Sequence, residues 1–284
     1  MNLRLAFART TSAATKLAEA VTGVPIGFRI LIFHDVTPAE RSAFEDLVAH
    51  LAGRDALLSP DAAARWIAGD TPVKSTAPAP CLLTFDDGFA GNHELAASVL
   101  AKYGVKAVFF VCPGLVDLDA EAQLAAVRAN VVRRDFTDAN SMGRLRLMNW
   151  QEIGDLAATG HAIGAHGMTH RALSSLAGDE LRREILESGA RIEAAISRPV
   201  DWYAYAFGGI DHISAAALEI IAERYLLCRS GIRGRNRAGA NRLALFADHV
   251  DLSAPRTYQR LTAEGALDLA YLGRRRRYLA MCQQ

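Results

Sequence analysis

The chain has 284 residues, of which 51% are hydrophobic and 22% charged, an ordinary composition for a globular protein long enough to form one large α/β domain. Basic and acidic residues nearly cancel, leaving a formal net charge of +1, and no aromatic-rich basic stretch occurs, so we expect no nucleic-acid partner. The one basic cluster is Arg274 to Arg277. We interpret it as a solvated helix end in preference to a patch for anionic lipid or a phosphate-bearing substrate.

The N-terminal segment, residues 1–27, carries Arg4, Arg9 and Lys16 within a short apolar stretch. Because a signal peptide needs an uninterrupted apolar core, this segment is predicted to be an amphipathic helix that packs on the domain or makes peripheral contact with a membrane. No stretch approaches the roughly 18–20 apolar residues that cross a bilayer. The four cysteines are widely spaced and form no CxxC pair, which favours a reducing compartment. We therefore expect a cytoplasmic protein, associated with a membrane if this segment lies on one.

Along the chain, strand-like runs alternate with helix-like runs. Strands are expected at residues 28–33, 81–85, 105–111, 161–165, 202–206, 225–228 and 242–246, and helices at 39–51, 59–69, 92–103, 120–133, 150–159, 179–196, 214–224 and the C-terminus. Such alternation predicts parallel strands joined by right-handed crossovers. With about seven strand–helix units, an irregular (β/α)7-type barrel is favoured over an open sheet. Residues 28–284 are predicted to form this single domain, with an insertion at 115–148.

Polar or glycine-rich motifs follow four of the expected strands. They are His34-Asp35 after ILIF, Asp86-Asp87-Gly88 after CLLTF, His166 to His170 after HAIGA, and Phe207-Gly208-Gly209 after WYAYA. In parallel α/β folds the carboxyl ends of the strands form one rim, where active sites are built. We therefore expect these motifs to meet in one site.

Asp86 and Asp87 are adjacent carboxylates, which repel and raise one pKa unless a cation lies between them. An isolated pair of this kind would be interpreted as a helix-capping loop. Here the pair is complemented by His166 and His170, which lie in a glycine-containing turn that can direct both rings to one point. A protease-type zinc helix is not favoured, because Gly167 stands where that motif has glutamate.

Two histidines and one carboxylate make a metal site with open positions for water and substrate. The same triad could hold non-haem iron. The adjacent carboxylates Asp86 and Asp87 favour hydrolysis, since one can bind the metal while its neighbour handles a proton.

Two motifs resemble those of the polysaccharide deacetylase family, also called the NodB-homology family or carbohydrate esterase family four. TFDDG at 84–88 is similar to the first family motif and HGMTH at 166–170 to the second, and the resemblance covers roughly residues 30–227. It implies a barrel enzyme that uses a divalent metal, with Zn²⁺ preferred. The reaction implied is removal of N-acetyl groups from an amino sugar in a polysaccharide, oligosaccharide or glycolipid.

The resemblance also implies residue roles. Asp87, His166 and His170 would bind the metal, and Asp86 would be the general base. AYAFG at 204–208 is similar to the third motif, but Ala206 and Phe207 replace the proline and tyrosine of the family. The Phe207 backbone would contribute to an oxyanion hole. The arginine of the commoner third motif is absent, so the residue that orients Asp86 is not identified.

The stretch ILIFHD at 30–35 resembles the histidine motif that such proteins normally carry near the C-terminus, as in the branch that acts on poly-N-acetylglucosamine. It implies His34 as general acid, with Ile32 lining the acetyl pocket. His249 is the alternative acid, and either histidine could instead be a hydrogen-bonded surface residue. Trp150 is predicted to lie in the core or in the wall of the substrate pocket.

Three functions are compatible with these motifs. The first is N-deacetylation of a glycan or glycolipid. The second is hydrolysis of a different amide, such as an N-formyl group on a lipid-linked amino sugar, which the basic cluster and the N-terminal segment would suit. The third is carbohydrate binding by a decayed hydrolase. Only the altered third motif favours this last function, since binding alone does not need both carboxylates.

Overall fold

The computed structural model describes residues 27–70, 80–132 and 144–282, so the amphipathic helix predicted at the N-terminus lies outside the described residues. The sheet has eight strands in the order β7-β6-β5-β4-β3-β1-β8, with β2 paired to β3, and every pairing between them is parallel. The strands are β1 (Arg29–Phe33), β2 (Leu57–Leu58), β3 (Cys81–Phe85), β4 (Val108–Val111), β5 (Ala162–Ala165), β6 (Trp202–Ala204), β7 (Leu227–Arg229) and β8 (Asp248–His249).

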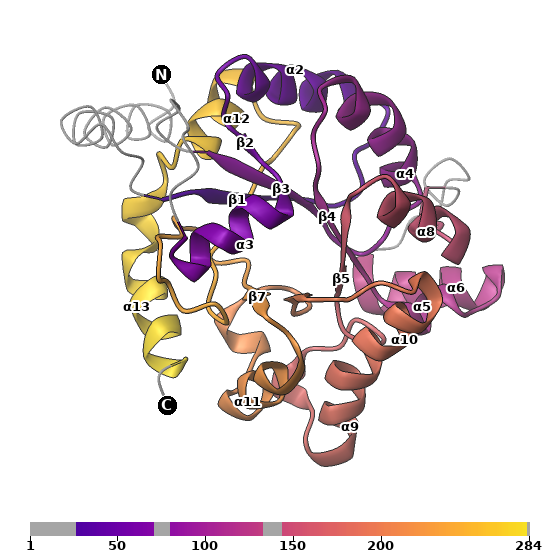
Figure 1. Ribbon diagram of the computed structural model, residues 1–284. Helices are drawn as coiled ribbons and strands as arrows, with labels where there is room; N and C mark the ends of the chain where they lie inside the picture. Colours follow the sequence, from indigo (N-terminus) through magenta and orange to yellow (C-terminus); the bar gives the residue numbers. More distant parts are fainter. Residues whose placement is uncertain (1–26, 71–79, 133–143, 283–284) are drawn as a thin grey trace.

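Helices surround the curled sheet (Figure 1). The α-helices are α2 (Arg41–Ala52), α3 (Pro60–Ala68), α4 (Gly91–Leu95), α5 (Pro113–Val116), α6 (Ala120–Ala126), α8 (Trp150–Ala158), α9 (Gly178–Arg182), α10 (Ser188–Ile196), α11 (Ala215–Arg224), α12 (Arg256–Ala263) and α13 (Leu272–Met281). Shorter 3-10 or π-type turns are η1 (Ala96–Leu100), η2 (Val127–Val132), η3 (Leu173–Ser175), η4 (Arg183–Glu187), η5 (Ile210–His212) and η6 (Asp268–Tyr271). The predicted (β/α)7-type barrel is confirmed. No helix among the described residues is long and apolar enough to cross a membrane.

Alternate residues of each strand face two different cores. In β1, Leu31 and Phe33 belong to the outer core between sheet and helices, whereas Ile30 and Ile32 belong to the core inside the barrel. At the amino end of the strands α3 closes this inner core, where Trp66 packs on Phe28 with ring centroids 5.8 Å apart. The opposite, carboxyl end is therefore the end left for a site.

Helix α3 begins where the sequence predicts. The Ser59 hydroxyl accepts a hydrogen bond from the Ala62 amide, Pro60 occupies the first turn, and Gly69 ends the helix in the left-handed conformation with φ 88°. These three residues explain why α3, the helix that closes the amino end of the barrel, begins and ends at these positions.

The strand predicted at 242–246 is wrong. Within that range only Leu245 makes a bridge, to Arg229 of β7, and the nearby strand is β8, Asp248–His249. The reason is a side chain: Asn236 takes both backbone hydrogen bonds of Phe246, one as donor and one as acceptor, at 2.9 Å each. Those groups are thus unavailable to a strand ladder.

Candidate active site

The residues that follow the strands enter the barrel because of strand alternation. Phe33, Phe85 and Ala165 all face the outer core, so the next residues, His34, Asp86 and His166, turn toward the barrel axis. They line a cavity of about 290 Å³ at the carboxyl rim. The cavity contains all the predicted site residues except Trp150, and also Val131, Gly208, Arg229 and Gly231.

Asp87, His166 and His170 form a buried group, the one cluster among the described residues whose ligand atoms could hold a metal ion. Asp87 Oδ1 lies 3.5 Å from His166 Nε2 and 3.2 Å from His170 Nε2. Each imidazole is oriented by a backbone carbonyl, at 2.7 Å from Nδ1 of His166 and 3.0 Å from Nδ1 of His170. A carbonyl can only accept, so Nδ1 carries the proton and Nε2 keeps its lone pair for a cation.

The carboxylate of Asp87 fits a cation as well. Its Oδ1 atom is buried and makes no hydrogen bond to any described residue. Burial raises the pKa of Asp87, but the imidazoles of His166 and His170, whose Nε2 atoms can carry a proton when no cation is bound, outweigh burial and hold that pKa well below its usual range. A buried, ionised oxygen facing two imidazole nitrogens is a suitable ligand set for a divalent metal such as zinc.

The backbone is strained at three places in this cavity. Asp87, His170 and Phe207 have φ angles of 70°, 61° and 64°, in the left-handed region that non-glycine residues rarely adopt. They are three of the five such residues in the described chain. Strain of this kind persists where the surrounding structure imposes it, often at functional sites.

Arg229, which the sequence reasoning missed, is the partner of Asp86. Its Nη2 donates to Asp86 Oδ1, its side chain is only 1% exposed, and its guanidinium lies 4.8 Å from the centre of the Phe110 ring. Burial raises the pKa of Asp86, but Arg229, followed by His166, lowers it further than burial raises it. Asp86 is thus held in place and ionised. The signal was present, because Arg229 ends β7 two residues after Leu227, which faces the barrel core.

The two candidate acids lie together, with ring centroids 5.5 Å apart. His34 Nε2 is 3.9 Å from Asp86 Oδ2, and its side chain is 44% exposed at the cavity mouth. Although His249 is exposed at the rim, loss of water around its ring by partial burial, followed by the charges of His34 and Arg233, lowers its pKa to about 4. A general acid must carry its proton at the working pH. His249 would be neutral near pH 7, so these surroundings favour His34.

Of the remaining residues predicted to contact substrate, Ile32 and Phe207 lie in the cavity wall and Trp150 does not. Ile32 lines the cavity, and the Phe207 ring lies 4.7 Å from that of His170. Trp150 is not in the cavity wall. It starts α8 on the outside of the barrel, where its Nε1 donates to Asp117 Oδ1 at 2.8 Å and Arg191 lies 4.6 Å from its ring. Its position supports a packing role and not the predicted contact with substrate.

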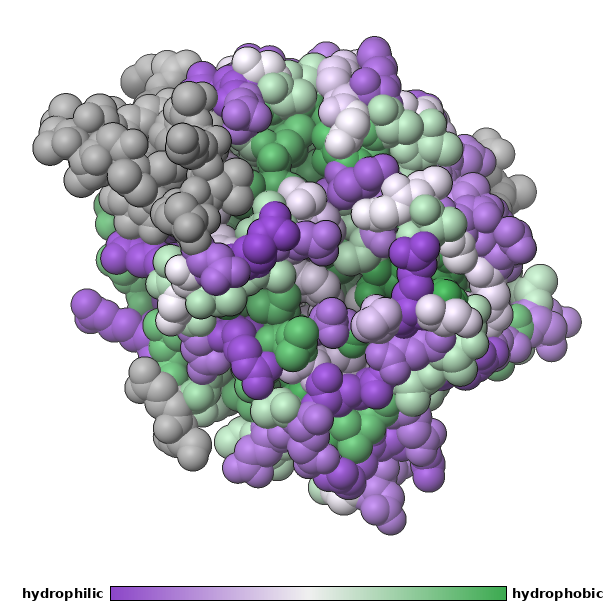
Figure 2. Space-filling view, viewed as in Figure 1, coloured by the Kyte–Doolittle hydropathy of each residue, from purple (hydrophilic) through white to green (hydrophobic). Residues whose placement is uncertain are grey.

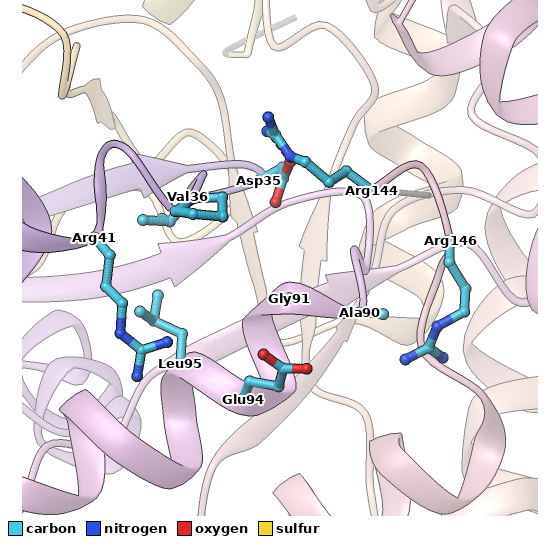
Figure 3. Close-up of a pocket in the computed structure, with 10 residues that line it drawn as sticks. Asp35, Val36, Arg41, Ala90, Gly91, Glu94, Leu95, Arg144 and Arg146 are labelled. Carbon is cyan, nitrogen blue, oxygen red and sulfur yellow. Dashed lines mark hydrogen bonds and ion pairs between the residues drawn. The ribbon is translucent and has the colours of Figure 1, made fainter. Parts of the chain in front are cut away.

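A second cavity, of about 300 Å³, lies beside the same strand ends (Figure 3). Its wall includes Asp35, next to His34, and three arginines from other segments. Arg144 Nε donates to Asp35 at 3.1 Å, and Arg146 makes two 2.8 Å hydrogen bonds to Glu152. Two of the three arginines in this wall are thus paired with carboxylates, whereas the Oδ1 atom of Asp87 has no hydrogen bond to a described residue.

Fold and site together define a parallel α/β barrel with a buried carboxylate–imidazole centre at its carboxyl rim. The sequence profile of the family described as polysaccharide deacetylase matches residues 74–223, just over half of the chain. The chain belongs to this family and is a hydrolase acting on amide bonds. The match begins after His34, so the proposed relation to the branch with an N-terminal histidine motif stays a prediction.

Solved structures share the fold. The chain is similar to IcaB from Ammonifex degensii, with TM-score 0.64, 18% identity, and coverage of 84% of this chain and 97% of that one. It is also similar to the deacetylase PplD of Streptococcus pyogenes, solved with acetate, with TM-score 0.66, 19% identity, and coverage of 84% and 99%. A third is a de-N-acetylase from Aggregatibacter actinomycetemcomitans, with TM-score 0.61, 14% identity, and coverage of 82% and 99%. No protein of curated function matches the sequence.

Proposed function

We propose that this protein removes N-acetyl groups from an amino sugar in a glycan or glycolipid, with a divalent metal, Zn²⁺ by preference, held by Asp87, His166 and His170. The observation that carries this proposal is that the adjacent carboxylates Asp86 and Asp87 have different partners. Asp87 presents a buried oxygen without a hydrogen bond to two imidazoles, while Asp86, beside it, is bound by Arg229. One carboxylate is thus suited to a cation and the other to a proton.

The metal would supply a lowered pKa for water and polarisation of the amide carbonyl. Asp86 is the general base that accepts the proton of the attacking water. Its hydrogen bond to Arg229 keeps the carboxylate oriented and ionised before the reaction. The two backbone carbonyls that bind His166 and His170 keep both rings from turning away during turnover.

His34 is the acid that protonates the leaving amine. Its place at the exposed mouth, 3.9 Å from Asp86, supports this role, as does the low pKa of the neighbouring His249. Ile32 would contact the acetyl methyl group. Phe207, fixed in a left-handed conformation in the cavity wall, would face the carbonyl oxygen through its backbone.

The acetyl substrate is supported by family membership and by the small cavity. The deacetylase PplD was solved with acetate, the product expected here. A formyl-specific hydrolase would use the same residues, so the acyl group must be measured directly. A binding protein that had lost catalysis would not need the Asp86–Arg229 pair.

The test combines metal analysis with release of acetate and formate from N-acylated oligosaccharides and glycolipids. We expect close to one bound metal per chain, acetate release, and loss of release after chelation. Asp86→Asn should keep the metal but lose about 10²–10⁴-fold in kcat, the usual contribution of a general base. Glu187→Gln, at an exposed position on η4, is the control. Stoichiometric metal without Asp86-dependent acetate release from any substrate would refute the deacetylase assignment.

A further inference from the structure

A second region of the molecule, outside the catalytic cavity, is strongly basic. It runs along α13 and the loop that precedes β8, and we call it the basic surface. Its members are Arg235, Arg237, Arg274, Arg275, Arg276 and Arg277, with Leu269 and Leu272 at its edge. Four of these arginines and Leu272 line a cavity of about 630 Å³.

Three exposed arginines of this surface, Arg274, Arg276 and Arg277, form no ion pair with a carboxylate among the described residues. Asp268 is the one carboxylate in the lining of the cavity, and the buried Arg29 already binds it through two hydrogen bonds of 3.1 and 2.7 Å. For the whole chain the formal net charge is only +1. The arginine excess is therefore a local asymmetry that attracts anions to one side of the molecule.

Exposed leucines stand next to these arginines. Leu269 is 54% exposed and Leu272 is 43% exposed, and they are two of the four large hydrophobic residues that are exposed in the described chain. In Figure 2, hydrophilic and hydrophobic residues lie side by side along the left edge, where Figure 1 draws α13. Arginines beside protruding leucines are the combination that lies at the boundary between lipid headgroups and acyl chains.

The basic surface is connected to the catalytic cavity through Arg233. Arg233 Nη2 donates to the backbone carbonyl of His249, a cavity residue, at 2.6 Å. The Tyr271 ring lies 5.8 Å from the Arg233 guanidinium and 5.5 Å from that of Arg274. The basic surface is therefore in contact, through Arg233, with the backbone of one cavity residue, while Asp268 in its own cavity binds Arg29 at the amino end of the barrel.

The N-terminal segment joins the domain at the same place. Phe28 is paired by two backbone hydrogen bonds of 2.9 Å with Asn236, which lies between Arg235 and Arg237. The segment that precedes Gly27 has three basic residues, Arg4, Arg9 and Lys16, against one acidic residue, Glu19. Its net charge is of the same sign as that of the basic surface, so both would attract an anionic partner.

The exposed leucines and the shared cavity change the interpretation of Arg274 to Arg277, which from the sequence alone were expected to be a solvated helix end. We propose that the basic surface docks the protein on a bilayer that contains anionic lipid, with the arginines at the headgroups and the two leucines below them. A soluble polyanion would use the arginines but not the leucines.

The experiment is co-sedimentation of the full chain with vesicles of phosphatidylcholine alone or with phosphatidylglycerol added. We expect binding to the anionic vesicles that weakens as salt is raised. The triple variant R274Q/R276Q/R277Q should bind at least tenfold more weakly. The variant L269S/L272S should also bind severalfold more weakly, which separates a bilayer from a soluble anion. Acetate release from a soluble substrate should be unchanged in both, showing intact folds.

The matched control removes three exposed arginines from another side of the protein, in R171Q/R182Q/R183Q, and should bind like the wild type. Equal binding of wild type to neutral and anionic vesicles would overturn the proposal. It would equally be overturned if the control lost as much binding as the α13 variant, or if the leucine variant bound normally. These outcomes do not depend on whether the enzyme is a deacetylase.

Discussion

Arg29 and Arg229 are both fully buried, yet they lie at opposite ends of the same barrel and have different surroundings. Arg29, at the amino end of β1, is bound by two carboxylates, Asp248 and Asp268. Arg229, at the carboxyl end of β7, has Asp86 as its one carboxylate partner among the described residues. Its Nη1 donates to the Ser230 carbonyl at 3.5 Å, and its Nε atom has no hydrogen-bond partner there. Arg29 connects β1, β8 and η6, whereas Arg229 connects the barrel to a reacting group.

The difference shows how one barrel divides its buried charges. Burial raises the pKa of Asp248 although Arg29 and Arg233 lower it. The ionised Asp248 therefore stabilises the fold only while it is paired with these arginines. Arg229 and the histidines lower the pKa of Asp86 despite burial, which maintains an ionised base. Arg29 at the amino end thus has a structural role and Arg229 at the carboxyl end a catalytic one. This agrees with parallel α/β barrels in general, whose active sites lie at the carboxyl end of the strands.

The largest effect is expected for Arg229→Met. Without the guanidinium, Asp86 loses its main orienting partner and its pKa rises, so kcat should fall by about 10²-fold or more. Because the lowered pKa keeps Asp86 ionised in mild acid, the variant should lose activity at higher pH than the wild type as the pH falls. A pH–rate profile measures this shift. Arg229→Lys should restore part of the activity, and an unshifted profile would reduce Arg229 to a structural role.

Arg29→Met should lower the free energy of unfolding and leave kcat nearly unchanged. It leaves the buried Asp248 with only Arg233, at 3.6 Å, and should cost about 3 kcal/mol of unfolding free energy. A carboxyl with a raised pKa destabilises the fold most when ionised, so the deficit should grow as pH rises above 3.8. Urea unfolding over a pH series tests this. Loss of kcat per folded molecule, comparable to that of Arg229→Met, would contradict the division between the two ends.

Substitution of His34 and of His249 tests which of the two histidines is the general acid at the carboxyl end of the barrel. His34→Asn should lower kcat by about 10²-fold, the contribution of a general acid. His249→Asn should change kcat less than tenfold, because a histidine with a pKa of about 4 holds almost no proton near neutral pH. Steady-state kinetics on one acetylated substrate compares them, and a larger loss in His249→Asn would exchange their roles.

The smallest effect is expected in the second cavity, despite its similar volume. Arg144→Gln removes an ion pair with Asp35, but the arginine side chain is 40% exposed. Exposed pairs contribute roughly 0–1 kcal/mol, so the free energy of unfolding should change by no more than this. Thermal unfolding and kcat on a short substrate check the expectation. A tenfold loss of kcat would make this cavity part of the catalytic machinery.

Much of the fold followed from local patterns. The apolar runs of the strands, the Ser59–Pro60 start of α3 and the alternation of strands and helices are set by neighbouring residues, so they are visible in the sequence. The strand prediction at 242–246 was wrong because the side chain of Asn236, ten residues before Phe246, takes the backbone hydrogen bonds of Phe246 that a strand would need. A tertiary hydrogen bond of this kind leaves no periodic signal.

The same contrast holds for the site. The sequence by itself determined the group Asp86, Asp87, His166 and His170, because strand ends place short motifs at one rim of a parallel barrel. Only the tertiary structure decided that Arg229 binds Asp86, a contact across 143 residues of sequence. It also placed Trp150 outside the cavity and surrounded His249 so that its pKa falls. Ligand types and their spacing are local properties of a chain, whereas the partner and the proton affinity of a buried group depend on which distant segments fold against it.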